Sequence, residues 1–547
     1  MPRRAKSRSQ KSPGELPPLK LRAPSFLEHK GFLFILIVFL LLALLLFDPK
    51  PFLGGDNATY IILAKSLLSG RGYLDLSAPN APPHKLYPPG YPLLLAPLLF
   101  LFPRFLLPLK FLSLVAASLS LYLSFRIFGC GSSGPGPGSS KETFAKNRTL
   151  GFSLAAFMAV NATYLEFSHW VLSEIPFLLA SLWVLSLLPR FAPPRSPDWR
   201  DVLLLAVTAS ATYYVRSAGI TLIFALFVFL LLRRRYRLAL FFAALTALFL
   251  LPWQVRNWLV RIEGTTYLGA FFLRDPYNQV AGNATLSEVL ARFLPNAKAY
   301  GLTILPQLLF SLPTPAPSYL ISLPLLSLLF YGFVGRIRSA RRVGAIEIYV
   351  LGTVLIALLW PQVWTDRRFL LPLLPFLLFY LLVGLRQLSR HVFKASGEKP
   401  FAFLVGLLIF LQFLFLLPAI PTNLRMISSY LSGDDLAGYP EPWVTFFQAA
   451  DWVKANTEPT AVVISRKPTL FYLRAERSSF IYPFTPEPES LNAVINRYKA
   501  DYILVDQVSG TTQRYLIPAL RPGIPDRYEL IHQTPEPATY ILRVKRP

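Results

Sequence analysis

Long apolar stretches, separated by short charged or proline-rich breaks, dominate the first 418 residues of the chain. A membrane-spanning helix needs about 20 mainly apolar residues, and the pattern predicts a membrane all-α bundle with about eleven such helices. Because no small-residue cleavage site follows the first stretch, we expect it to be a retained span and not a signal peptide. The stretches lie near residues 31–47, 106–128, 149–165, 170–188, 201–215, 217–232, 238–255, 318–334, 344–360, 369–385 and 400–418.

The pattern changes after about residue 419. Short apolar bursts at 461–464, 502–505 and 540–544 alternate with helical patterns at 445–455, 490–498 and 512–520. Such alternation is typical of a small α/β domain with one core. We therefore expect three parts: a basic N-terminal segment at 1–30, a transmembrane part at 31–418 and an α/β domain at 419–547.

Composition supports a membrane protein. The 547 residues are 53% hydrophobic and 15% charged, whereas a soluble protein has roughly a quarter of its residues charged. The one cysteine, Cys130, excludes an internal disulfide framework, a thiolate zinc site and an iron–sulfur cluster.

The net charge of +26 would suggest nucleic-acid binding in a soluble chain. Here the basic residues follow the membrane topology instead. Segment 1–30 holds eight, and the loops at 129–148, 189–200, 233–237, 335–342 and 386–399 hold three or four each. All six segments fall on one side, and cytoplasmic loops are enriched in Lys and Arg. We predict a multi-pass protein of the plasma (inner) membrane with a cytoplasmic N-terminus, an extracytoplasmic α/β domain and no nucleic-acid partner.

The first outer loop, about 48–105, combines a candidate acid with an apolar helix. Asp56 precedes apolar positions at Tyr60, Ile61, Ala64, Leu67 and Leu68, the spacing of an amphipathic helix lying in the membrane interface. Asp56 would stand at the N-terminus of this helix, where it could simply be an N-cap. The run at 93–102 is too short to span, so we expect a juxtamembrane or re-entrant segment there.

Further polar residues collect on the same predicted side. Ionisable groups at the membrane cost several kcal/mol and by default mark a functional site. We therefore expect a cavity at the outer leaflet. Its candidate residues are Asp56, Lys85, Glu174, Arg216, Arg256, Asn257, Asp366, Arg367 and Arg368.

Five motifs occur in a specific order. They are Gly-Asp-Asn-x-x-Tyr from Gly55, Lys-Leu-Tyr-Pro-Pro-Gly-Tyr-Pro from Lys85, Ser-Glu-Ile-Pro from Ser173, Leu-Pro-Trp-Gln-Val-Arg-Asn from Leu251, and Asp-Arg-Arg-Phe-Leu-Leu-Pro from Asp366. Over residues 31–418 this order resembles the polytopic C-superfamily glycosyltransferases, nearest to the glycosyltransferase family 39-like protein O-mannosyltransferases and aminoarabinose transferases.

The resemblance implies a polyprenyl-phosphate sugar donor and two acids in catalysis, which map by position to Asp56 and Glu174. One departure concerns Lys85. The family's basic residue directly precedes Pro-Pro, whereas Leu86 and Tyr87 intervene here, so a phosphate role for Lys85 stays open.

The residue types suit this chemistry. A carboxylate that takes the proton of an attacking hydroxyl or amine supplies general-base help, and Asp56 is the candidate. Arginine forks fit phosphate oxygens, so Arg256 and Arg368 are the first donor-binding candidates, followed by Lys85, Arg216 and Arg367. Asp56 and Glu174 could also share Mg²⁺ or Mn²⁺. We expect Tyr60, His84, Tyr87, Asn257 and Asp366 to line the substrate site.

Structural explanations for the same residues stay open. The arginines could reach lipid headgroups, Glu174 could pair with Arg216 or Arg256, and the tyrosines could belong to an aromatic belt. The sequence thus predicts an inverting membrane glycosyltransferase that acts on an unidentified acceptor at the outer face. A secondary transporter and a noncatalytic membrane scaffold are the alternatives.

Overall fold

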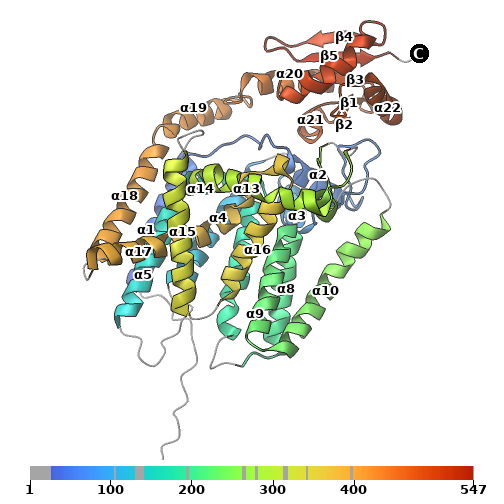
Figure 1. Ribbon diagram of the computed structural model, residues 1–547. Coiled ribbons are helices and arrows are strands. Elements are labelled where there is room, and N and C mark those ends of the chain that lie inside the picture. Colours follow the sequence, from blue (N-terminus) through green and yellow to red (C-terminus); the bar gives the residue numbers. More distant parts are fainter. Residues whose placement is uncertain are drawn as a thin grey trace, which may run out of the picture.

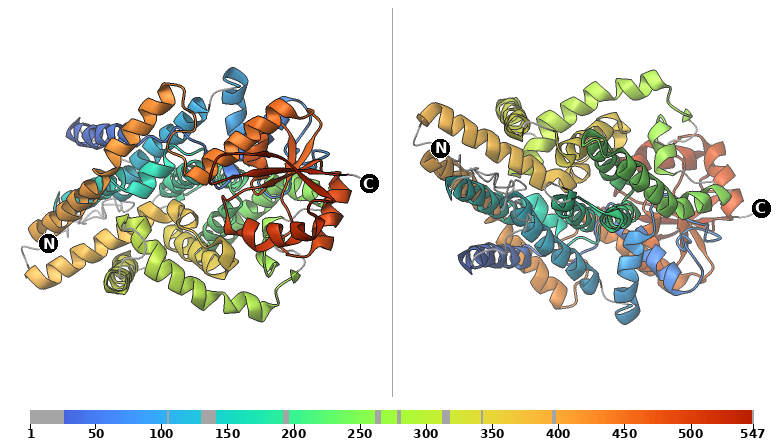
Figure 2. Two further views of the ribbon diagram at one scale, coloured as in Figure 1. Left: turned by 90° about the horizontal axis from the view of Figure 1, so that it is seen from above. Right: turned by 90° about the horizontal axis from the view of Figure 1, so that it is seen from below.

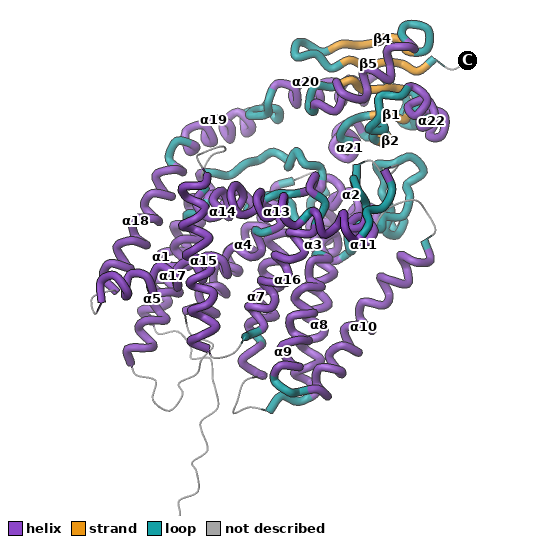
Figure 3. Tube along the Cα trace, in the orientation of Figure 1, coloured by secondary structure: helices purple, strands orange, loops and turns teal. Residues whose placement is uncertain are grey.

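The computed structural model describes residues 26–545 except 104–105, 130–140, 192–195, 261–265, 278–280, 312–317, 341–342 and 395–397. A helical bundle makes up most of it, and a small sheet lies at the C-terminal end of the chain (Figures 1 and 3). Each predicted span overlaps a helix. These helices are α1 (Phe26–Leu45), α4 (Leu107–Gly129), α5 (Lys141–Ala159), α7 (Glu174–Ser186), α8 (Trp199–Val215), α9 (Ile220–Leu232), α10 (Tyr236–Leu259), α15 (Ser318–Ala340), α16 (Ala345–Leu359), α17 (Leu374–Phe393) and α18 (Glu398–Leu416).

Six stretches in the described part of the chain are long and apolar enough to cross a membrane. They contain α4, α7, α10, α15, α17 and α18. The helices at Lys30–Leu45, Ser217–Leu232 and Ala345–Leu359 are apolar but shorter. The membrane helices are thus confirmed, and the number of about eleven spans stays a prediction.

Helix α17 forms the centre of the bundle. Its membrane stretch is 83% buried, against 22% for α10, α15 and α18. Tyr380 and Phe376 of α17 are almost completely buried and pack edge-on against Phe333 of α15 and Tyr349 of α16. The outer helices accordingly show apolar side chains to the surroundings, as a lipid-facing surface requires.

Short helices cover the end of the bundle that faces the sheet, and α13 and α14 lie across it (Figure 1). Helix α3 carries the short apolar run and has 12 residues, which confirms that the run is too short to span. These helices are α2 (Asp56–Leu68), α3 (Gly90–Leu101), α6 (Ala162–Phe167), α11 (Tyr267–Phe272), α12 (Leu286–Ala291), α13 (Phe293–Ala299) and α14 (Leu305–Phe310).

The interfacial placement predicted for the helix after Asp56 is wrong. Nine of the 13 residues of α2 are buried, from Asn57 to Ser66. One side of α2 contacts α3 and the other contacts α21, and Ala58 belongs to the same hydrophobic core as Phe446 and Phe471 of the C-terminal segment. Because protein covers both sides of the helix, its apolar stripe does not lie in the membrane interface.

The C-terminal segment folds as the expected α/β unit, with the mixed five-stranded sheet order β2-β1-β3-β5-β4. Strand β1 pairs in parallel with β2 and β3, and β5 pairs antiparallel with β3 and β4. The predicted strands and helices are present, and β2 and β4 are additional. The elements are α19 (Ala419–Leu431), α20 (Glu441–Asn456), β1 (Val462–Ile464), α21 (Pro468–Ala475), β2 (Ser478–Phe480), α22 (Pro488–Tyr498), β3 (Tyr502–Val505), α23 (Ile517–Leu520), β4 (Tyr528–Gln533) and β5 (Tyr540–Val544).

The α/β unit lies over one part of the bundle, as the view from above shows (Figure 2). The first loop lies between the α/β unit and the bundle. The amide of Ser479 in β2 donates to the carbonyl of Ser77 at 2.7 Å, so the loop pairs with the edge of the sheet. The hydroxyl of Thr469 in α21 donates to the carbonyl of Gly55 at 3.3 Å.

Candidate active site

Arg368 joins the two predicted catalytic acids. Its Nη2 lies 2.6 Å from Oδ2 of Asp56, and its Nε lies 2.7 Å from Oε1 of Glu174. The three residues come from the start of α2, the start of α7 and the segment before α17. The structure therefore brings the two candidate acids and one candidate arginine together, and the roles of these residues stay predictions.

Two glycines near this site permit a backbone conformation and a close helix contact that a residue with a Cβ would disfavour. Gly55, the residue before α2, has φ +100°, a left-handed conformation that glycine adopts easily. A Cβ on Gly90 would lie 2.5 Å from the backbone of Tyr214, so α3 approaches the end of α8 closely only because this residue is glycine.

The N-cap explanation for Asp56 is wrong. Gly55 occupies the N-cap position, and no side chain caps α2. The Asp56 carboxylate instead accepts from the Tyr87 hydroxyl at 2.9 Å through Oδ1 and from Arg368 through Oδ2. Its side chain keeps 27% exposure, so the carboxylate is held in place yet open to a partner.

Glu174 is completely buried. Its Oε1 lies 2.9 Å from Nη1 of Arg216 as well as near Arg368. Arg216 also donates to the hydroxyl of Ser173 at 2.9 Å, which is 3.0 Å from the Tyr60 hydroxyl. The pairing of Glu174 with Arg216, one of the structural alternatives, is thus present. Among the described residues, Oε2 of Glu174 has no hydrogen-bond partner.

Aromatic rings form one wall of the site. The ring of Tyr87 lies 4.8 Å from Tyr60, 5.3 Å from His84 and 6.0 Å from Tyr267. Burial and the charge of Asp56 raise the pKa of Tyr87 well above its usual range. Burial lowers the pKa of His84 to about 4, and its Nε2 accepts from the amide of Tyr87 at 3.0 Å. Both side chains are therefore neutral at physiological pH.

Opposing effects set the charge of Asp56. Burial raises the pKa of its carboxyl, but the charge and hydrogen bond of Arg368, with help from Tyr87 and Arg216, outweigh burial and lower the pKa below its ordinary value. Burial lowers the pKa of Arg368, yet Glu174 and Asp56 raise it well above the ordinary value. The site thus holds an ionised carboxylate against a permanent cation.

Arg256 and Asn257 have partners outside this cluster. Arg256 donates to the carbonyls of His84 and, at 3.1 Å, Tyr73, and to the side chain of Asn257 at 2.9 Å. These contacts fasten the first loop to the end of α10. The donor-binding role predicted for Arg256 stays a prediction, but the arginine has a structural task.

The remaining predicted residues surround the cluster. Arg367 pairs with Glu166 at 2.7 Å, and Glu166 is a residue that the sequence analysis missed. Asp366 accepts from the backbone amide of Arg368 at 2.9 Å and so orients that residue. Lys85 is partly buried in the loop before α3.

Two further residues beside Asp56 were also missed. Lys467, directly before α21, donates to the carbonyl of Gly54 at 3.1 Å. Burial, followed by the charge of Arg466, lowers its pKa to about 8, although Asp56 and Asp506 act in the opposite direction. Asn57 is 1% exposed, and neither polar atom of its amide has a partner in the described part of the chain.

The arrangement does not fit a divalent cation shared by Asp56 and Glu174. Arg368 contacts both carboxylates and so occupies the position between them. Within the described residues, no group of three or more His, Cys, Asp or Glu side chains could hold a metal ion. The Mg²⁺ or Mn²⁺ site expected from the sequence is therefore unconfirmed, and Arg368 makes the bridging contact instead.

Comparison with known proteins gives matches at the level of structure. No family pattern and no curated sequence matches the chain. The oligosaccharyltransferase AglB from Archaeoglobus fulgidus, solved with an inhibitory peptide and a dolichol-phosphate, has a TM-score of 0.54 and 13% identity, over 88% of this chain and 70% of that one. ArnT from Cupriavidus metallidurans in the apo state has a TM-score of 0.53 and 13% identity, over 94% of this chain and 98% of that one.

The chain has the C-superfamily glycosyltransferase fold. A further structure of ArnT, bound to undecaprenyl phosphate, matches at a TM-score of 0.50 and 11% identity, over 93% of this chain and 97% of that one. The resemblance inferred from the five motifs is thus confirmed for the fold. Identities this low leave the substrates of this chain to be argued from its own residues.

Proposed function

We propose that the protein is an inverting membrane glycosyltransferase, which moves a sugar from a polyprenyl-phosphate donor to an acceptor at the outer face of the membrane. The observation that carries the proposal is the contact of Arg368 with both Asp56 and Glu174. A phosphate-binding fork beside an ionised, partly exposed carboxylate suits this reaction. The dolichol-phosphate and undecaprenyl phosphate in structures of the same fold support a donor of this class.

The proposed reaction is one in-line displacement. A hydroxyl or amine of the acceptor attacks the anomeric carbon, the bond from that carbon to the phosphate oxygen breaks, and the sugar configuration inverts. The proton of the nucleophile goes to Asp56, and the electron pair of the broken bond stays on the polyprenyl phosphate. General-base help of this kind contributes about 10²–10⁴-fold to the rate.

Charge balance assigns a role to Lys467. Asp56 and Glu174 already neutralise Arg216 and Arg368. A donor phosphodiester would therefore bring an uncompensated negative charge into a partly buried site, which is unfavourable. The hydrogen bond of Lys467 to the carbonyl of Gly54 places an ammonium two residues before Asp56. In our proposal, Lys467 turns to the donor phosphate and supplies the missing positive charge.

The position of the charges favours a transferase over a transporter. Transporter sites lie near the bilayer midplane, between broken helices. Asp56 and Glu174 instead begin α2 and α7, and Arg216 and Arg368 lie in connections between helices. All four lie at one end of the bundle, beneath the α/β unit.

The test is transfer from a radiolabelled polyprenyl-phosphate hexose by the purified protein in lipid nanodiscs. Asp56→Asn keeps the shape of the side chain and should lower transfer or release of the sugar at least 10²-fold. Asp526→Asn, on the exposed surface of the α/β unit, is the matched control and should be fully active. An active Asp56→Asn protein would remove the proposed base.

A further inference from the structure

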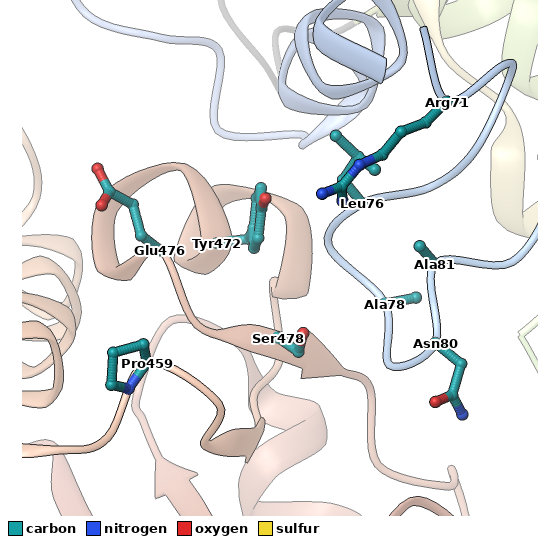
Figure 4. Close-up of a pocket in the computed structure, with 9 residues that line it drawn as sticks. All are labelled: Arg71, Leu76, Ala78, Asn80, Ala81, Pro459, Tyr472, Glu476 and Ser478. Atoms are coloured by element: carbon teal, nitrogen blue, oxygen red, sulfur yellow. The ribbon is translucent and has the colours of Figure 1, made fainter. Parts of the chain in front are cut away.

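A cavity of about 320 Å³ lies between the first loop and the α/β unit (Figure 4), and no residue of the Asp56 cluster lines it. It is separate because α2 and α21 run side by side. Lys467 and Gly54 meet near the N-terminal ends of these helices, and Arg71 and Glu476, just beyond their C-terminal ends, line the cavity. The helices have 13 and 8 residues, which puts the cavity about 12–20 Å from Asp56.

Polar residues from both sides line the cavity. In Figure 4 the side chain of Arg71 points toward Tyr472, whereas those of Asn80 and Glu476 point away from the space between the loop and the α/β unit. Arg71 and Asn80 come from the loop, and Tyr472, Glu476 and Ser478 come from the α/β unit (Figure 4). Within the described part of the chain, Arg71, Asn80, Tyr472 and Ser478 make no side-chain hydrogen bond, whereas Glu476 binds Lys454 through Oε1 at 2.8 Å. The guanidinium fork of Arg71 and the hydroxyls of Tyr472 and Ser478 therefore remain available to a ligand.

The loop keeps a strained backbone where it lines the cavity. Asn80 and Ala81 have φ 62° and 42°. A left-handed conformation costs a residue with a Cβ roughly 1–2 kcal/mol, and alanine has no polar group to offset that cost. The loop is held there by the amide of Ala81, which donates to the carbonyl of Ala78 at 3.1 Å, and by the pairing of Ser77 with Ser479. Strain that the surroundings maintain often occurs at ligand sites.

The same pairing argues against a peptide ligand. Peptides commonly bind a sheet by adding a strand to its edge. Strand β2 is an edge strand, but Ser77 already accepts from Ser479 in its middle. A saccharide fits better, because its hydroxyls match the mixed donors and acceptors and its C–H faces can pack on Tyr472, Leu76 and Pro459.

We propose that this cavity binds a saccharide unit of the acceptor, at a distance from the unit that reacts at Asp56. The identification of the ligand as part of the acceptor rests on the proposed function. The binding of a saccharide rests on the cavity alone. The acceptor would be a glycan or glycolipid of several sugar units, one bound in the cavity and another reaching the carboxylate.

Binding can be tested without transfer. We would titrate full-length Asp56→Asn protein in nanodiscs with the methyl glycosides of glucose, galactose, mannose and glucuronic acid, and with a seryl tripeptide. Saturation-transfer NMR would report binding. At least one glycoside should bind, Arg71→Ala should weaken binding about tenfold or more, and Ala78→Phe, which fills the cavity, should abolish it. Arg543→Ala, on the exposed surface of the α/β unit, is the control.

Three results would overturn the proposal. They are the absence of binding by all four glycosides, glycoside binding that survives in Ala78→Phe, and binding of the tripeptide alone. A second readout covers the possibility that Ala78→Phe misfolds: in wild-type protein a bound glycoside should slow hydrogen exchange at residues 71–81, and unchanged exchange would also refute the idea. None of these measurements depends on a working transferase.

Discussion

Removing the charge of Lys467 should weaken donor use in a way that depends on pH. The perturbation is Lys467→Gln, beside Lys467→Arg, which keeps a charge over the whole working range. A charge-assisted hydrogen bond contributes about 1.5–3 kcal/mol, so Lys467→Gln should lower kcat/KM for the donor roughly 10- to 150-fold. Lys545→Gln, on the exposed end of the α/β unit, should change nothing.

The sign of the pH effect follows from the pKa of Lys467, which is lowered to about 8 by burial and Arg466 against the opposing charges of Asp56 and Asp506. The ammonium is present below that pH and is lost above it. Since kcat/KM reports groups of the free enzyme, its value for the donor should fall about tenfold from pH 7 to pH 9 in the wild type.

The assay is the initial rate of sugar transfer at limiting donor concentration from pH 6 to pH 9.5. Lys467→Arg should show no fall near pH 8, and Lys467→Gln should be low and flat there. If both variants keep the wild-type slope, another group titrates and Lys467 does not bind the phosphate. If Lys467→Gln has normal kcat/KM at pH 7, the charge-balance argument is wrong even if the enzyme is active.

Four other predictions concern the same region. Arg368→Lys should keep the charge but lose the fork, so the donor KM should rise about tenfold or more with little change for the acceptor; equal effects on both would refute a donor role. Arg368→Ala should also lower the stability by roughly 3–5 kcal/mol, because it removes a partner of the buried Glu174, and a thermal shift assay against Arg543→Ala would detect this. Arg256→Ala should increase the rate of protease cleavage at residues 70–87 and leave the donor KM nearly unchanged. A raised donor KM with an unchanged cleavage rate would instead support a phosphate-binding role for Arg256. Transfer should persist in a chelator, because Arg368 joins the two acids without a metal, and loss that Mg²⁺ or Mn²⁺ restores would contradict this.

The sequence predicted the membrane helices and much of the α/β unit because both depend on local patterns. Strands β1, β3 and β5 are apolar bursts. Strand β2 is three residues long and begins with two serines, and β4 has a register irregularity between Leu530 and His532. Neither gives a periodic signal that differs from a loop.

The acids and Arg368 could be predicted because charges beside apolar spans are unusual. Their partners depended on contacts between distant segments. Lys467 lies 413 positions from Gly54, and the stripe of α2 looked interfacial only because the protein surface on its other side, near Phe446, was invisible in the local pattern. Arg256 binds backbone carbonyls, which carry no sequence signature.

The hydrogen bond between Ser479 and Ser77 has a consequence for protein engineering. A graft that exchanged only the C-terminal unit with that of a distant homologue would leave residues 71–81 facing a foreign strand. In such a chimera the sheet should pack poorly against the loop unless residues 71–81 are transplanted along with the C-terminal unit. In our proposal, recognition of the acceptor depends on two segments that lie far apart in the sequence, and both would have to change together.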